Sequence, residues 1–159
     1  MNENKLLANG KITDLYHFYE NRSSRNSEGI EYINSAGQRK AFVTNKLIIR
    51  SGTKIDSLLD YGCTYGSFCN EGKKLVGIKK VLGLDSIFEA IKVDKSSLIL
   101  SGLEFHTINR LETRALRDYI RGIANCRFGC ISLIDVLEHV HNCRDLVRAL
   151  SDSCETFLN

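Results

Sequence analysis

The sequence predicts an α/β fold in which a parallel sheet is flanked by helices. Short apolar segments that have the character of strands alternate along the chain with longer segments whose apolar residues recur at helical period. Strands separated by helices favour right-handed crossovers and therefore a parallel sheet. The first strand also runs directly into a glycine loop that opens a helix, which is a typical junction of such folds.

The composition indicates a globular protein. The 159 residues are 43% hydrophobic and 26% charged, and the net charge of +3 is too small to predict nucleic acid as a partner. No apolar run has the length of a membrane span, so we expect no membrane partner. The N-terminus lacks a signal-peptide pattern, and the six cysteines form no C-x-x-C pair. We therefore expect reduced cysteines, no metal site and a cytoplasmic location.

The N-terminal part predicts two helices, over residues 12–21 and 37–50. In the second helix Ala41, Phe42, Leu47 and Ile48 are the apolar residues at helical period. We interpret residues 1–52 as an N-terminal helical segment and residues 53–159 as the main domain.

The first strand, over residues 55–60, ends in Asp60 and leads into a loop with Gly62 and Gly66. Glycines let the backbone approach a ligand, and the N-terminus of the following helix (about 66–75) favours anions. Neither the G-x-G-x-x-G fingerprint nor the P-loop ending is present. What remains is the pattern acid-x-Gly-x-x-x-Gly. It predicts either a ligand-binding loop or a simple turn between strand and helix. In this helix we expect Phe68, Leu75 and Val76 to face inward.

The second strand, over residues 80–84, is followed by Asp85, about 20 residues after Gly66. In nucleoside-binding α/β folds an acid at this spacing accepts hydrogen bonds from the ribose hydroxyls. The alternative is that Asp85 caps the helix predicted over residues 86–101, which Gly102 would end.

The remaining elements continue the alternation. We predict a third strand over residues 103–108, a helix from about residue 111 to 123, a fourth strand over residues 128–134, and a last helix capped by Asn142. The fourth strand is followed by the run Asp135-Val-Leu-Glu-His-Val.

The glycine loop, Asp85 and the run after the fourth strand together resemble the class I S-adenosylmethionine-dependent methyltransferases. The resemblance is strongest to the small-molecule subgroup similar to quinone-biosynthesis methyltransferases, and it covers about residues 55–150. One departure is Thr64, where the common family loop has a glycine.

The resemblance implies S-adenosyl-L-methionine as cofactor and assigns roles to residues. The loop backbone would hold the methionine end of the cofactor, Asp60 its ammonium, Asp85 its ribose and Asn109 its adenine. Catalysis would need a general base only if the methyl acceptor is weakly acidic, and His139 is the candidate base. Alternatively, Glu138 and His139 only support the last helix. The cofactor-binding residues expected in this way are Asp60, Gly62, Cys63, Gly66, Asp85, Asn109 and Asp135.

The resemblance also implies a Rossmann-like three-layer sandwich with strand order 3-2-1-4. The family sheet has seven strands, so strands 5–7 would be missing, and we expect self-association through the exposed edge of strand four. The N-terminal helices would either place Tyr16, Tyr19 and Tyr32 over the cofactor or pack as ordinary amphipathic helices.

The expected function is methyl transfer to a small-molecule acceptor, and we expect little or no activity from this chain alone because it is truncated. One alternative is a non-catalytic cofactor-binding or interaction module, and a further one is an RNA methyltransferase. Basic patches interleaved with aromatic residues, which RNA binding favours, are missing from the sequence.

Overall fold

The computed structural model describes residues 27–85, 102–108, 113–124 and 127–155. The chain divides into two compact units, Met1–Ser35 and Ala36–Asn159, and each is considered by itself. The helices expected over residues 12–21 and 86–101 lie outside the described residues, as do Tyr16, Tyr19 and Asn109. The division into residues 1–52 and 53–159 stays a prediction.

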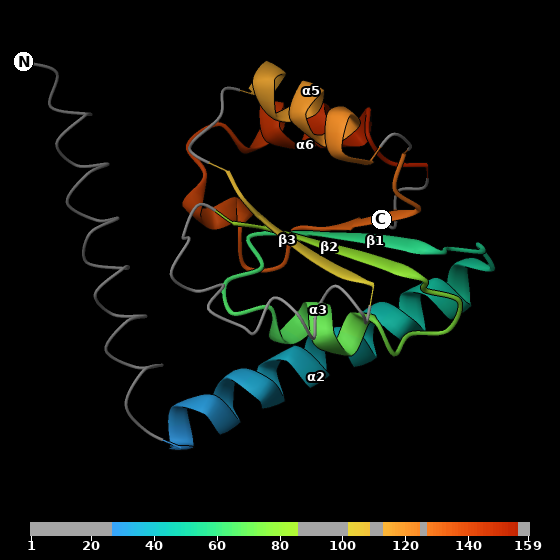
Figure 1. Cartoon of the computed structure of the whole chain (residues 1–159), viewed down its shortest axis with the longest axis vertical. Coiled ribbons are helices and arrows are strands. Elements are labelled where there is room, and N and C mark those ends of the chain that lie inside the picture. Colours follow the sequence, from blue (N-terminus) through green and yellow to red (C-terminus); the bar gives the residue numbers. More distant parts are fainter. Residues whose placement is uncertain (1–26, 86–101, 109–112, 125–126, 156–159) are drawn as a thin grey trace, which may run out of the picture. The chain divides into compact units, whose positions relative to one another are not determined.

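The centre of the second unit is a four-stranded parallel sheet (Figure 1). Its strands are β1 (Ser57–Tyr61), β2 (Lys80–Asp85), β3 (Leu103–Thr107) and β4 (Cys130–Ser132). They lie in the order β3-β2-β1-β4, and all neighbouring pairs are parallel. The predicted fold class and strand order are confirmed. The fourth strand is shorter than the expected 128–134.

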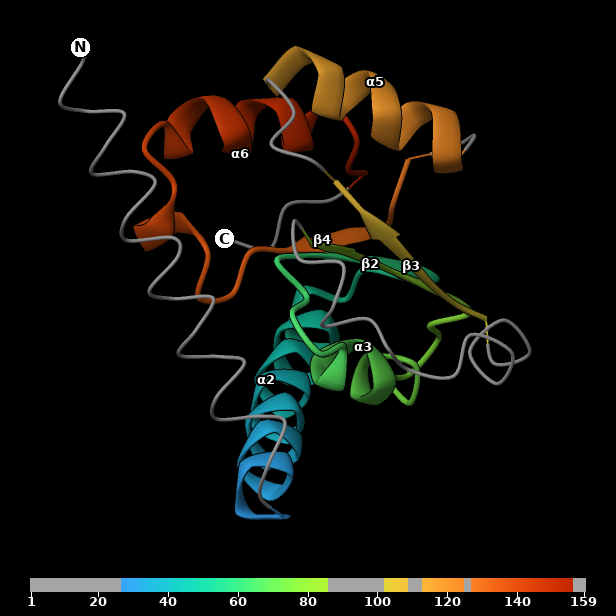
Figure 2. The same ribbon diagram turned by 60° about the vertical axis from the view of Figure 1, so that its left-hand side comes forward.

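Apolar residues on both faces of the sheet explain why it is covered by two layers of helices. Leu58 belongs to a core cluster shared with helices α2 (Ser27–Ser51) and α3 (Ser67–Gly72). Leu59, the next residue, belongs to a cluster shared with α5 (Thr113–Ala124) and α6 (Cys143–Ser151). Consecutive strand residues point to opposite faces, so a strand with both faces covered is largely apolar. Figures 1 and 2 show α5 and α6 on one face of the sheet, with α3 on the other.

Of the four apolar residues at helical period in the helix predicted over residues 37–50, Ala41 and Ile48 are buried in α2, whereas Phe42 is 61% exposed and Leu47 41% exposed. Gly37 and Thr44 are buried as well. After α3, Val76 is 70% exposed, so the expectation that it faces inward is wrong. The buried face of α2 follows a spacing of three and four residues, and the apolar residues between these positions fall on the solvent side.

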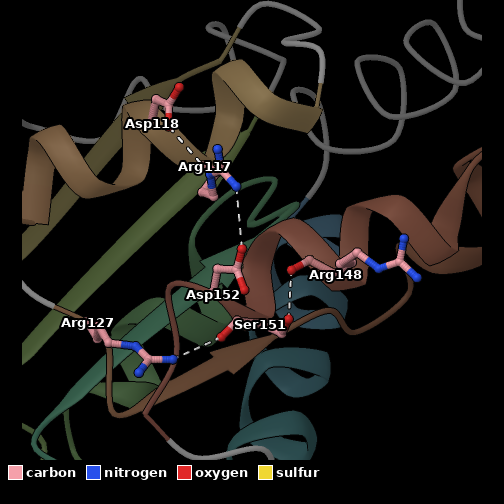
Figure 3. A network of polar contacts seen from close by, with 6 residues as sticks. All are labelled: Arg117, Asp118, Arg127, Arg148, Ser151 and Asp152. Carbon is pink, nitrogen blue, oxygen red and sulfur yellow. Dashed lines mark hydrogen bonds and ion pairs between the residues drawn. The ribbon is translucent and has the colours of Figure 1, made fainter.

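Polar contacts join α5 to the end of α6. Arg117 lies between Asp118 and Asp152, with an N···O distance of 3.5 Å to each (Figure 3). The Arg127 guanidinium donates to the backbone oxygen of Ser151 at 3.4 Å, and the Ser151 hydroxyl donates to that of Arg148 at 2.7 Å. Such exposed contacts contribute little stability each, so the apolar cluster beneath them holds the two helices together.

The start of α6 and the start of β4 have further local support. Asn142 stands at the N-cap as expected, but its side chain bonds to Asp145 rather than to a backbone N–H. Beside β4, the N–H of Phe128 donates to the oxygen of Ser153 at 2.9 Å, and the N–H of Glu155 donates to the oxygen of Phe128 at 2.8 Å. Phe128 and Cys154 thereby form a parallel bridge. The outer side of the segment leading into β4 is therefore paired within the chain.

Of the described cysteines, four are buried and Cys143 is exposed, and none forms a disulfide. Among the described helices, none combines the length and apolar character that crossing a membrane requires.

Candidate functional site

The candidate site lies at the carboxyl ends of β1, β2 and β4. From β1 the chain passes to β2 on one side, while β4 pairs on the other side, so the direction of winding changes at β1. In open α/β sheets ligands bind at this kind of switch point, outside the carboxyl ends of the strands. The glycine loop predicted from the sequence follows β1 at this point.

The loop between β1 and α3 has a backbone that favours glycine at three positions. The φ angles are +81° at Gly62, +48° at Thr64 and +70° at Gly66. The N–H groups of Gly62 and Cys63 both donate to the oxygen of Leu84, at 2.7 and 3.2 Å. Thr64 therefore occupies a left-handed conformation that is a rare outlier for a β-branched residue. Its position is the one where the related family commonly has a glycine.

Close packing also requires glycine at both ends of the loop. A Cβ atom on Gly62 would lie 2.5 Å from Cγ2 of Val136, and one on Gly66 would lie 2.6 Å from Cζ of Phe105. Val136 belongs to the turn after β4, so the two loops that flank the switch point are in contact. Cys63, another predicted site residue, belongs to this loop and is buried.

Asp60 lies beneath the loop and is buried. The hydroxyl of Ser132, on the neighbouring strand, donates to Oδ1 of Asp60, and Sγ of Cys69 donates to Oδ2 at 3.6 Å. Burial raises the pKa of Asp60 from 3.8 to about 6, although the Ser132 hydroxyl and the charge of Lys40 lower it. A cationic ligand group beside Asp60 would therefore stabilise the charged form of its carboxylate.

Asp85 is buried at the end of β2 and accepts a hydrogen bond from the backbone N–H of Thr64 at 2.7 Å. The predicted ribose-binding carboxylate therefore also fixes the loop that follows β1. Sequence spacing placed Asp85 at the strand end, but it gave no signal of this bond. Its charge also contributes, after burial, to the raised pKa of Tyr61.

Asp135 stands in the turn after β4 with a φ of +58°. Its carboxylate forms an ion pair with Lys40 of α2, with Nζ 2.8 Å from Oδ2. Sequence reasoning missed Lys40. The sequence only placed Lys40 in the helix predicted over residues 37–50. It could not indicate the ion pair with Asp135, because the two residues lie far apart in the chain.

The candidate base His139 and its neighbour Glu138 lie in the segment that follows Val136. His139 belongs to the short 3-10 helix η2 (Leu137–His139), and both His139 and Glu138 are exposed. The structure thus brings together Asp60, Gly62, Cys63, Gly66 and Asp85, with Asp135 at the neighbouring turn. The roles of all these residues, and of Asn109, stay predictions.

Solved structures with the same fold were found, while no curated protein matches the chain. An amino pentose methyltransferase from Micromonospora echinaspora (CalS10), with bound S-adenosylmethionine, has a TM-score of 0.61 and 16% identity. The plantazolicin methyltransferase BpumL has a TM-score of 0.59 and 18% identity. The magnesium protoporphyrin IX methyltransferase of Synechocystis PCC 6803 has a TM-score of 0.56 and 13% identity.

These matches cover 84%, 94% and 98% of this chain, and 54%, 53% and 73% of the respective neighbours. The chain therefore spans about half the length of the first two structures. At such low identity the likeness shows the fold alone.

A family model described as a methyltransferase domain matches residues 10–156, which is nearly the whole chain. This match agrees with the glycine loop, the acids at the strand ends and the sheet order already described. The chain therefore belongs to this methyltransferase domain family.

Proposed function

We propose that the chain binds S-adenosyl-L-methionine and transfers its methyl group to a small-molecule acceptor. The observation that carries this proposal is the loop at residues 62–66, with positive φ at three positions and its backbone tied to Asp85. A loop of this form lets the backbone approach a ligand closely while acids stand beside it.

The cofactor's chemistry fits the charges of the site. S-adenosyl-L-methionine carries an ammonium, a sulfonium, a carboxylate and a ribose diol. We assign the ammonium to Asp60 and the diol to Asp85, since a carboxylate offers two acceptors to neighbouring hydroxyls. Backbone groups of Gly62, Cys63 and Gly66 would contact the methionine end of the cofactor. Asp135 would also contact the cofactor, from the turn after β4.

The chemistry of methyl transfer asks little of the protein beyond position. The cofactor supplies the reactive carbon, and the chain's residues orient it and exclude water. The solved neighbours are named for methyltransferases of an amino pentose, plantazolicin and magnesium protoporphyrin IX, which supports a small-molecule acceptor. His139 is the candidate base where the acceptor must lose a proton.

A second candidate function is cofactor binding without methyl transfer. The exposed position of His139 on η2 favours it, because catalysis by a base needs that base held in place beside the acceptor. We also propose a cytoplasmic location and self-association through the β4 edge.

Calorimetry with S-adenosyl-L-methionine and with its demethylated product tests the cofactor. We expect saturable binding of both by the purified chain, and no binding by an Asp60→Asn, Asp85→Ala double variant. Absence of binding to the unaltered chain would contradict the proposal. Label transfer from methyl-labelled cofactor to a panel of small acceptors then separates the two functions, since a binding module would give none.

A further inference from the structure

We propose that Ser132 is a positioning residue for cofactor binding: its hydroxyl holds the Asp60 carboxylate in the orientation and in the charged form in which it takes the ammonium. This inference rests on the proposed function, because it deepens the role assigned to Asp60. It adds the last residue of β4 to the site.

The register of the sheet places Ser132 beside Asp60. The two residues are direct partners in the parallel pairing of β1 with β4. Neighbouring strands lie about 4.8 Å apart, and partner side chains share one face of the sheet, so the short serine side chain can reach the carboxyl group. The Ser132 hydroxyl donates to Oδ1 of Asp60, and both residues are buried.

The Asp60 carboxyl group has a hydrogen-bond donor at each oxygen. Ser132 donates to Oδ1, and Sγ of Cys69 donates to Oδ2 at 3.6 Å. A thiol is a weak donor, so the hydroxyl supplies the stronger of the two bonds. A carboxylate has about four lone-pair positions, and both oxygens can therefore still accept from an ammonium. The two bonds orient the carboxyl group without saturating it.

Several elements act on the charge of Asp60. Burial raises its pKa to about 6, and the charge of Asp85 at the end of β2 raises it as well. The Ser132 hydroxyl, the charge of Lys40 on α2 and the thiol of Cys69 lower the pKa, and the effect of Ser132 is the largest of these three. Without this hydroxyl, Asp60 would keep its proton up to a higher pH, and a neutral acid attracts an ammonium less.

The first measurement follows Asp60 itself, in the chain without cofactor. NMR of the aspartate carboxyl carbons gives the pH midpoint of its titration, and Asp60→Asn assigns the signal. A hydrogen bond to a charged acceptor corresponds to about one to two pH units. We expect Ser132→Ala to raise the midpoint by this amount and Ser132→Thr, which keeps a hydroxyl, to restore it. An unchanged midpoint in Ser132→Ala would overturn the proposal.

The second measurement compares two ligands that share the nucleoside. S-adenosylhomocysteine carries the ammonium, whereas methylthioadenosine lacks the amino acid end. Calorimetry between about pH 5 and pH 7 keeps the ammonium charged. At about pH 6 we expect Ser132→Ala to bind S-adenosylhomocysteine roughly five- to fiftyfold more weakly than the unaltered chain, as the higher midpoint requires. The affinity for methylthioadenosine should not change, and Ser132→Thr should bind both ligands like the unaltered chain.

Ser153→Ala is the matched control. Ser153 is also a buried serine, but its hydroxyl has no hydrogen-bond partner among the residues that the structure describes. This variant should change neither the Asp60 midpoint nor either affinity, and thermal unfolding shows whether each variant is folded.

Two results of the binding experiment would overturn the role of Ser132. One is an unchanged affinity of Ser132→Ala for S-adenosylhomocysteine, and the other is an equal loss in Ser132→Ala and Ser153→Ala. An unaltered chain that binds neither ligand would instead contradict the proposed cofactor, while the titration of Asp60 would still test the hydrogen bond.

Discussion

At the scale of single residues, Thr64 stores strain in the loop after β1. A β-branched residue at a φ of +48° costs on the order of 1–2 kcal/mol, while glycine accepts this angle without strain. Part of the gain is lost because glycine is more flexible in the unfolded chain. We expect Thr64→Gly to raise the free energy of unfolding by up to about 1 kcal/mol, measured by urea denaturation.

Thr64→Ala is the control for the lost side chain, because it removes the hydroxyl and the branching but keeps a Cβ atom at positive φ. It should stabilise the chain less than Thr64→Gly does. A glycine variant less stable than the alanine variant would show that the Thr64 hydroxyl, which lies 3.3 Å from the oxygen of Gly62, matters more than the strain.

Asp60 is the residue that links pH to stability. Its pKa is about 6 in the folded chain and near 3.8 when unperturbed, so between these values the folded state holds a proton that the unfolded state has lost. The contribution of Asp60 to stability therefore falls as the pH rises from about 4 to about 6, and stays low above. The total amounts to about 2–3 kcal/mol.

Asp60→Asn removes this titration. We expect the variant to gain stability relative to the unaltered chain as the pH rises, by about 2 kcal/mol between pH 4.5 and 7.5. Urea denaturation at several pH values measures the difference. Parallel stability profiles for the two proteins would mean that the carboxyl group titrates in the folded state near its ordinary value.

At the scale of elements, the crossing of α2 over the start of α3 depends on Gly37. In Gly37→Ala the new Cβ atom would meet backbone atoms of Ser67 at 2.7 Å, and backbone cannot move away easily. Overpacking of this kind costs about 1–3 kcal/mol and outweighs the roughly 1 kcal/mol that alanine gains in a helix. We expect a net loss of stability of up to about 2 kcal/mol, with weaker cofactor binding.

Gly122 in α5 offers the matched control. A Cβ atom on Gly122 meets nothing within 4 Å, so Gly122→Ala gains helix propensity without a clash. Chemical denaturation of both variants should show opposite signs. Stabilisation by both substitutions would mean that α2 and α3 can separate without cost.

At the scale of the whole molecule, the segment from Ser153 to Glu155 pairs with the residues that lead into β4. Two backbone hydrogen bonds join it to Phe128, and Ser153 and Cys154 are buried. A chain ended after Asp152 leaves both polar groups of Phe128 without these partners. We expect it to lose at least about 2 kcal/mol of stability and to self-associate more, since unpaired strand edges favour association.

A chain ended after Glu155 is the control, because it keeps both hydrogen bonds. Urea denaturation measures the stability of the two chains, and sedimentation at several concentrations measures their association. Equal stability of both truncated chains would show that the bridge at Cys154 contributes nothing.

The elements and the loop were predictable because their signals are local. Apolar runs located the strands, helical period located α5 and α6, and the order of glycines and acids located the site after β1. The strand order 3-2-1-4 was implied by the family resemblance and is confirmed. The elements and the loop themselves depend on residues close together in the chain, whose side-chain period or backbone preference is set by their own chemistry.

The contacts between these elements were decided only by the tertiary structure. The bond from Thr64 to Asp85, the packing of Gly62 against Val136 and the ion pair of Lys40 with Asp135 each join distant segments. The same holds for α2, where the angle of approach buries Thr44 and exposes Phe42. A sequence states which residues are apolar or charged, but the register of the strands and the crossing of the helices determine which of them meet.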